Sequence, residues 1–134
     1  MGGPALINGS QVPETDNFFP ASFEENGIRY QSAEQYFQCA KACNVRDFQY
    51  VLHSPVHSMY AAGQNITLRT DWENIKVKIM FHANYLKYRQ NPQIAAVLGK
   101  TEGPILCTSS TPFWNEKNCY ILNEIRALIK DGLL

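Results

Sequence analysis

Residues 26–42 read NGIRYQSAEQYFQCAKA and contain two independent folding signals. Asn26-Gly27 is typical of the two-residue turn of a β-hairpin, because both residues accept a positive φ. Ser32 and Gln35 have the spacing of a capping box, in which side chains satisfy the free N–H groups at the start of a helix. This segment therefore predicts short strands near 21–24 and 28–31 and a helix over 33–43.

Three polar residues of this helix fall on one face. Glu34, Gln38 and Lys41 are spaced i, i+4 and i+7, and residues at this spacing point the same way. Glu34 and Lys41 are two turns apart, about 10 Å along the axis, which is too far for an ion pair between neighbouring turns. Two long side chains at that separation would reach opposite ends of one small ligand. The alternative is a solvated polar stripe, and the residue pattern by itself leaves both open.

The rest of the chain predicts five further helices and one strand. Ser54-Pro55 resembles a helix start, Thr70 and Glu73 form a second capping box, and Asn91-Pro92 both stops one helix and starts the next. The expected helices cover 44–53, 54–63, 70–90, 91–99 and 118–130, and the expected strand covers 104–108. The fold class is therefore mainly α (α+β), with about six helices and a small antiparallel sheet. We expect residues 1–16 to be a loosely held lead-in and residues 17–134 to form one domain.

Composition limits the classes of function. The chain has 134 residues, with 12 Lys and Arg against 12 Asp and Glu. A net charge near zero argues against attraction of the whole molecule to nucleic acid or an anionic membrane. No stretch has the length of a transmembrane helix, and the start of the chain has no basic n-region of a secretory signal. We therefore expect no membrane partner, a cytoplasmic or nuclear location and reduced cysteines; the oligomeric state stays open.

A metal site can be considered at four residues within 19 positions: Cys39, Cys43, His53 and His57. Zinc accepts such ligands. However, the two cysteines are spaced as on a helix, and Ser54-Pro55 interrupts any helical relation between the histidines. We expect no metal and no cofactor.

Two tryptophans are candidate binding residues. Trp72 follows Arg69 closely, and Trp114 follows Phe113. Aromatic rings near a cation suit stacking on a heterocyclic base beside a phosphate or sugar. The alternative for each tryptophan is packing in the core.

Four ordered motifs resemble the YbiA-like family, also called NADAR domains. The motifs resemble, in chain order, an Asn-Phe-Tyr-Pro opening, a signature helix, a long helix and a Lys-Phe-x-Gln-Asn-Pro turn. In this chain they read NFFPASF at 17–23, GIRYQSAEQYFQCAKA at 27–42, LRTDW at 68–72 with Lys76 and Met80, and KYRQNP at 87–92. The match extends over about residues 17–116.

This resemblance implies an N-glycosidase that acts on ribosides. Members of the family are associated with cleavage of ribosylamino-pyrimidines and with removal of ADP-ribose from guanine in nucleic acid. By this likeness Glu34 and Lys41 become catalytic residues. The likeness further implies that substrate is bound by Asn17, Gln38, Arg69, Trp72, Thr111 and Trp114. The partner it implies is a small riboside or an ADP-ribose-type ligand, with ADP-ribosylated nucleic acid as a further substrate class.

The chemistry suits these residue types. Departure of a base from ribose builds positive charge at C1′ and O4′, which a carboxylate such as Glu34 stabilises. Lys41 could donate a proton to the leaving base, or attack C1′ as a neutral amine if a desolvated pocket lowers its pKa. The sequence leaves these two roles open.

The last motif departs from the family. Its Asp-x-Phe-Trp-Gly pattern aligns with residues 111–115, TPFWN, so that Thr111 stands in place of an aspartate. A hydroxyl supplies no carboxylate near pH 7, and loss of one electrostatic group costs on the order of 100- to 1000-fold in rate. The alternative function is therefore a catalytically weakened module that binds ADP-ribose or a nucleotide.

Overall fold

The helix that follows Ser32 is the centre of the fold. In the computed structural model, which describes residues 1–134, this helix is α1 (Ala33–Ala40). The Ser32 hydroxyl accepts a hydrogen bond of 3.1 Å from the Gln35 N–H, as the capping box predicts. The Gln35 side chain in turn accepts from the Gln31 N–H at 2.6 Å. α1 packs against α4 on one side and against α2 and α3 on another.

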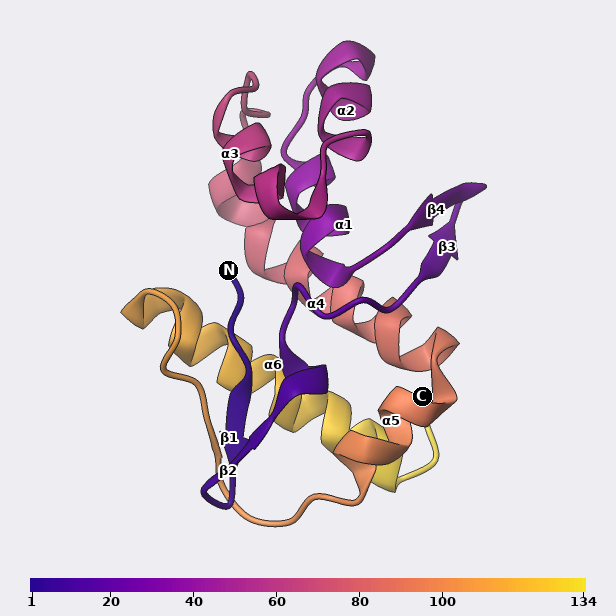
Figure 1. Ribbon diagram of the computed structural model, residues 1–134, viewed down its shortest axis with the longest axis vertical. Coiled ribbons are helices and arrows are strands. Elements are labelled where there is room, and N and C mark those ends of the chain that lie inside the picture. Colours follow the sequence, from indigo (N-terminus) through magenta and orange to yellow (C-terminus); the bar gives the residue numbers. More distant parts are fainter.

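The predicted hairpin is present directly before α1. Strands β3 (Phe23–Glu25) and β4 (Ile28–Tyr30) pair antiparallel. Asn26 and Gly27 have φ values of 54° and 79°, the combination that a tight hairpin turn requires. The hairpin projects from the side of the helical body, as Figure 1 shows.

The helices confirm the predicted class: a single mainly helical domain with small antiparallel sheets. α4 crosses the middle of the molecule, with α1, α2 and α3 at one end and α5 and α6 at the other (Figure 1). The elements after α1 are α2 (Val45–Leu52), the 3-10 helix η2 (Val56–Ser58), α3 (Met59–Gln64), α4 (Trp72–Gln90), α5 (Pro92–Gly99) and α6 (Pro112–Lys130). None of them combines the length and the apolar character needed to cross a membrane.

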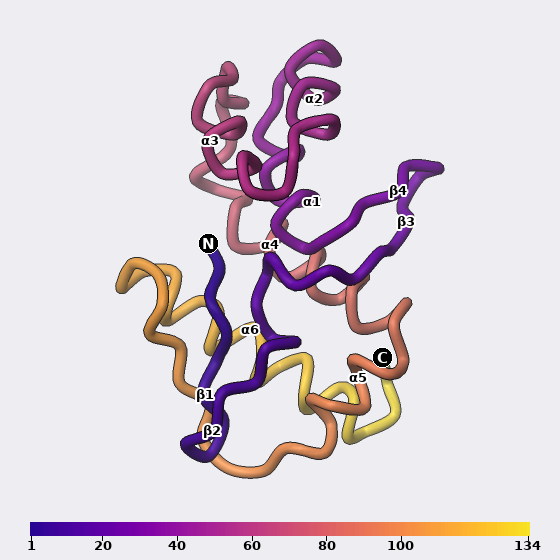
Figure 2. Tube along the Cα trace, viewed as in Figure 1, coloured from indigo at the N-terminus to yellow at the C-terminus, as the bar shows by residue number.

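Residues 1–16 differ from the loosely held lead-in that we expected. They contain β1 (Ala5–Ile7), β2 (Ser10–Val12) and the 3-10 helix η1 (Pro13–Thr15). A second sheet has the order β2-β1-β5, in which β5 is the short strand Ile105–Leu106 within the predicted 104–108. All its pairs are antiparallel. β1 is the central strand, and its Ala5 is fully buried in the same core cluster as Ile121 and Ile125 of α6. Figure 2 shows the path of the chain through β1 and β2.

Several helix ends differ from the prediction. The Ser54 hydroxyl bonds back to the Tyr50 carbonyl and caps no helix, and Gly63 lies inside α3. α4 begins at Trp72 without a side-chain cap, so the capping box at Thr70 is wrong. α6 starts at Pro112, six residues before the predicted start, because Thr111 caps it.

The core consists of two clusters of buried side chains. The larger lies between α4, α5, α6 and β1 and includes Phe37, Trp72 and Trp114. The smaller lies beneath α2, α3 and the hairpin and includes Phe23 and Val51. α1 contributes to both clusters, because Phe37 and Cys39 point to different sides of this helix.

A cap substitution tests how far the fold depends on the start of α1. We predict that Ser32→Ala lowers the free energy of unfolding by about 1 kcal/mol, because the Gln35 N–H loses its acceptor. Urea denaturation measures the change. Ser58→Ala is the control, since Ser58 precedes α3 without a side-chain cap bond; its effect should stay within about 0.5 kcal/mol. Equal losses in the two variants would contradict the role of Ser32.

Candidate active site

The polar face of α1 is buried. The exposed fraction of the residue is 0% for Glu34, 0% for Gln38 and 4% for Lys41. The alternative of a solvated polar stripe is therefore wrong. Burial of charged groups costs free energy unless they find partners, so the contacts of these three residues indicate what the face is for.

Glu34 is fully paired inside the protein. One carboxylate oxygen, Oε1, lies 2.8 Å from the ammonium group of Met1. The other, Oε2, accepts a hydrogen bond of 2.6 Å from the Gln38 side-chain amide. A cation and a neutral donor together replace the water that burial removes, as a buried carboxylate requires.

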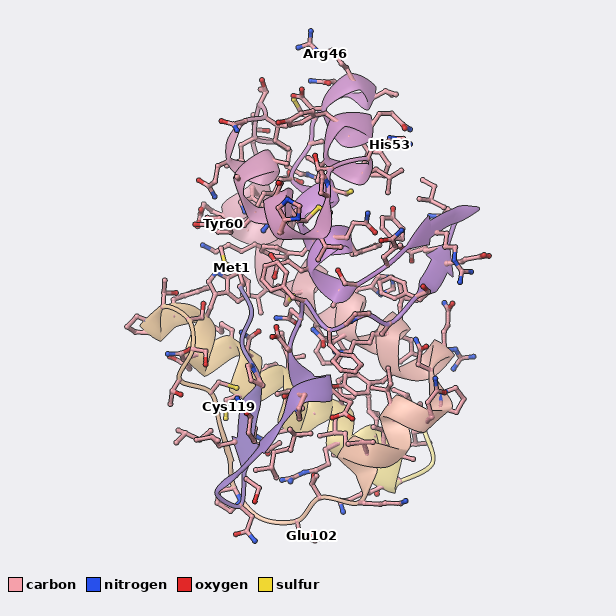
Figure 3. All side chains as sticks on the ribbon, viewed as in Figure 1. Met1, Arg46, His53, Tyr60, Glu102 and Cys119 are labelled. Atoms are coloured by element: carbon pink, nitrogen blue, oxygen red, sulfur yellow. The ribbon has the colours of Figure 1, made fainter.

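Met1 is held over Glu34 by two asparagines. Its carbonyl oxygen accepts hydrogen bonds from the side-chain amides of Asn17, at 2.8 Å, and Asn118, at 3.0 Å. Met1 precedes β1, and in Figure 3 it lies on the same side of the molecule as Tyr60. The start of the chain thus closes one side of the site.

Lys41 is a buried cation without a partner. It is the C-cap residue directly after α1, and its ammonium group makes no hydrogen bond or ion pair. The nitrogen lies 5.5 Å from the ring centre of Phe37 and 5.9 Å from that of Tyr60. Burial lowers the pKa of the Lys41 amine, and the charge of Glu34 opposes part of that effect. A larger share of this amine is therefore neutral near pH 8 than in an exposed lysine.

A cavity of about 270 Å³ opens in front of Lys41. Its aromatic wall has Phe37 at the centre, with ring centres 5.0 Å from Trp72 and 5.2 Å from Trp114. The two tryptophans belong to the core cluster, as the core alternative predicts, and they also line the cavity; the binding interpretation stays a prediction. The remaining lining residues come from α3, α4, the connection between them and the start of the chain: Met1, Gly63, Gln64, Ile66, Leu68, Glu73 and Lys76.

Of the predicted catalytic pair, only Lys41 faces the cavity. Glu34 is not among the lining residues, because Met1 covers it. The carboxylate therefore becomes accessible from the cavity only when the Met1 ammonium moves away.

Four predicted binding residues do not line the cavity. Gln38 lies behind its wall and holds Glu34, and Asn17 is buried between Met1 and Asn84. The Arg69 guanidinium pairs with Asp71 at 2.7 and 3.1 Å. The exposed Thr111 accepts a hydrogen bond from the Trp114 N–H and so caps α6.

Sequence reasoning missed two groups of lining residues. Glu73 and Lys76 follow Trp72 on α4, and the i, i+4 spacing of Trp72 and Lys76 was a visible signal that they share a face. Met1 and Gly63 gave no such signal, because only the tertiary fold brings them to α1. No three His, Cys, Asp or Glu side chains come together as metal ligands.

Comparison with known proteins shows the family and the fold of this chain. The family model of the NADAR domain matches residues 6–115, and the chain belongs to this family. The solved structure of the Escherichia coli protein YbiA is similar in fold, with a TM-score of 0.77 and 20% identical residues over 89% of this chain and 79% of that one. No curated protein shows a significant sequence match.

Gly63 provides a test of how the site is supported. A Cβ atom at this position would lie 1.9 Å from the Gln38 Oε1 atom and 2.9 Å from its Cδ atom. We predict that Gly63→Ala displaces the Gln38 amide from Glu34 and lowers the free energy of unfolding by roughly 1–3 kcal/mol, measured by urea denaturation.

The same substitution in a Gln38→Ala background is the control. Removal of the Gln38 side chain creates room for the new methyl group, so Gly63→Ala should then cost less than about 0.5 kcal/mol. An equal cost in both backgrounds would show that Gly63 does not act through Gln38.

Proposed function

We propose that this protein is an N-glycosidase that cleaves the bond between C1′ of a ribose and a base nitrogen in a ribosyl or ADP-ribosyl substrate. The observation that carries the proposal is the unpaired, buried Lys41 amine, which faces an aromatic cavity next to a buried carboxylate. Membership of the NADAR family supports the same class of reaction. The substrate would be a ribosylamino-pyrimidine or ADP-ribosylated guanine.

The aromatic wall suits one part of such a substrate. Trp72 and Trp114 present apolar ring surface to the cavity, on which a planar base or the apolar face of a sugar can pack. Their burial also keeps water away from Lys41. A dry cavity strengthens each electrostatic contact with the reacting sugar.

Glu34 would supply negative charge where the reaction builds positive charge. As the base leaves, C1′ and O4′ become electron-poor, and a carboxylate nearby lowers the barrier. In this account the substrate displaces the Met1 ammonium, and the developing cation at C1′ replaces it as the partner of Oε1. Gln38 keeps the other oxygen in place throughout.

Lys41 would act as the nucleophile. Its neutral amine adds to C1′ while the C1′–N bond breaks, and the electron pair of that bond leaves with the base, whose nitrogen takes up a proton. Opening of the ribose ring then gives an imine between C1′ and Nζ, which water hydrolyses to release the sugar and the amine. The lowered pKa of Lys41 is what this role requires, since only the neutral amine can attack C1′; the same shift would also make the ammonium a better proton donor.

The second candidate function is a module that binds an ADP-ribose-type ligand without cleaving it. Two observations favour it. The Met1 ammonium already pairs with the Glu34 carboxylate. Thr111, which stands where the family has an aspartate, caps α6 and supplies no carboxylate. Tight binding of ADP-ribose in calorimetry, together with no release of base from either substrate class, would establish this function.

Substitution of the proposed catalytic pair tests the enzyme. We predict that Glu34→Gln lowers turnover by about 100- to 1000-fold, and that Lys41→Met lowers it by at least about 100-fold. Release of base from ribosylamino-pyrimidine or from ADP-ribosylated guanine oligonucleotide is the measurement.

The matched controls are Glu124→Gln and Lys117→Met, which alter groups outside the cavity and should retain activity. Circular dichroism checks that each variant folds. Wild-type turnover that persists in both Glu34→Gln and Lys41→Met would exclude this site as the catalytic one.

The role of Lys41 predicts a pH dependence. Because the pKa of its amine is lowered from the usual 10.5, the neutral form appears as the pH rises towards that lowered value. Trapping of the imine with borohydride, read as a mass increase on the peptide that contains Lys41, should therefore rise with pH and level off below 10.5. Turnover without any trapped adduct, at a rate that falls as the pH rises, would instead assign proton donation to Lys41.

A further inference from the structure

Cys107 and Cys119 belong to two segments that pack against each other. Cys107 directly follows β5, and Cys119 lies in the first half of α6. Ile105, the first residue of β5, is 6% exposed, whereas Leu106 is 55% exposed. Because side chains alternate between the two faces of a strand, Cys107 continues the inner face of β5 together with Ile105. This face lies against the larger core cluster, to which α6 also contributes.

Two independent contacts bring these cysteines into one place. The Cys119 thiol donates a hydrogen bond of 3.0 Å to the carbonyl oxygen of Ile105, two residues before Cys107. Cys107 in turn lines a small internal cavity together with Asn118 and Leu122, which flank Cys119 on α6. Each cysteine therefore lies beside the immediate neighbours of the other.

The surroundings of Cys107 indicate the order in which the two thiols would react. Burial raises the pKa of the Cys107 thiol to about 11, and the charge of Cys119 adds to that effect. The second contribution agrees with the contacts above, because charges alter each other's ionisation over short distances. The thiolate is the form of cysteine that attacks a disulfide. Cys107 is therefore the poorer attacking group, and Cys119 would react first.

We propose that Cys107 and Cys119 form a reversible disulfide, which makes the contact between β5 and α6 sensitive to redox conditions. The Cys119 thiolate attacks one sulfur of a small disulfide such as oxidised glutathione, whose S–S bond breaks and releases one glutathione thiolate. Cys107 then loses its proton and attacks the Cys119 sulfur of the mixed disulfide, which releases the second glutathione. The protein loses two hydrogen atoms, and the two glutathione molecules gain them. Under reducing conditions the same exchange runs backwards and restores both thiols.

The disulfide would close a covalent ring around the start of α6. The ring runs from Cys107 to Cys119 and contains Thr111, which caps α6. Closing such a ring removes conformational freedom from the unfolded chain and so stabilises the folded one. β5 has only two residues and lies at the edge of its sheet, so a covalent link to α6 would fix a weakly held strand. Neither sulfur lines the cavity of Lys41, and the inference does not depend on the proposed function.

The other two cysteines do not form a comparable pair. Cys39 is 1% exposed, and burial raises the pKa of its thiol to about 12. Cys43 is exposed, so its thiol is open to glutathione and to the Cys43 thiol of a second molecule. Cys43→Ser removes these side reactions and is therefore the background in which the pair is tested.

Peptide mapping tests the pair directly. The folded Cys43→Ser protein is incubated with oxidised glutathione, alkylated and digested without reductant, and mass spectrometry identifies the linked peptides. We expect a link between the peptides of Cys107 and Cys119 as the main product, and its disappearance on return to reduced glutathione. In urea, where the fold no longer brings the two cysteines together, the preference for this link should be lost. Mixed disulfides without the link, or no reaction of the folded protein, would overturn the inference.

Thermal unfolding measures the consequence of the link. Oxidation should raise the melting temperature of the Cys43→Ser protein by roughly 5–10 °C. Cys107→Ser and Cys119→Ser, each added to this background, should abolish the rise, whereas Cys39→Ala is the matched control and should keep it. Circular dichroism checks that each variant folds. A rise that persists in Cys107→Ser, or a link that forms without any rise, would refute the role of the disulfide in holding β5 to α6.

Discussion

The carboxylate of Glu34 is shielded from water, and the need to pair this buried charge links distant parts of the chain. Gln38 comes from the same helix, whereas the Met1 ammonium comes from the start of the chain and binds Oε1 at 2.8 Å. Asn17 and Asn118 hold Met1 from the segment before the hairpin and from α6. The Asn17 carbonyl also accepts a hydrogen bond of 2.8 Å from the Glu34 N–H. One buried charge thus connects α1, α6 and the N-terminal segment.

The aromatic side chains turn this arrangement into a site. Phe37 stands between Trp72 and Trp114, so that α1, α4 and α6 meet on three rings that are both core and cavity wall. The same packing excludes water from Lys41 and lowers the pKa of its amine. Stability and the lowered pKa therefore have a common origin here: the rings that hold the helices together also keep the lysine poorly solvated.

Local signals in the sequence predicted much of the fold. The Asn26-Gly27 turn and the Ser32 cap are short-range features, and both occur as expected, as does the shared face of Glu34, Gln38 and Lys41. The pairing of β5 with β1 depends on residues about 100 positions apart, which no local pattern reports. The ion pair between Met1 and Glu34 could not be predicted from a local pattern either, because the two residues are 33 positions apart. The start of α6 was a readable signal that we missed, since Thr111-Pro112 has the cap-and-proline pattern of a helix start.

The most direct test of this account is a crystal structure of the protein with ADP-ribose bound. The account predicts that the ribose occupies the cavity with C1′ in contact with the Lys41 nitrogen, and that the Met1 ammonium has moved away from Glu34. A ligand bound elsewhere, or bound in the cavity while Met1 still covers Glu34, would contradict it.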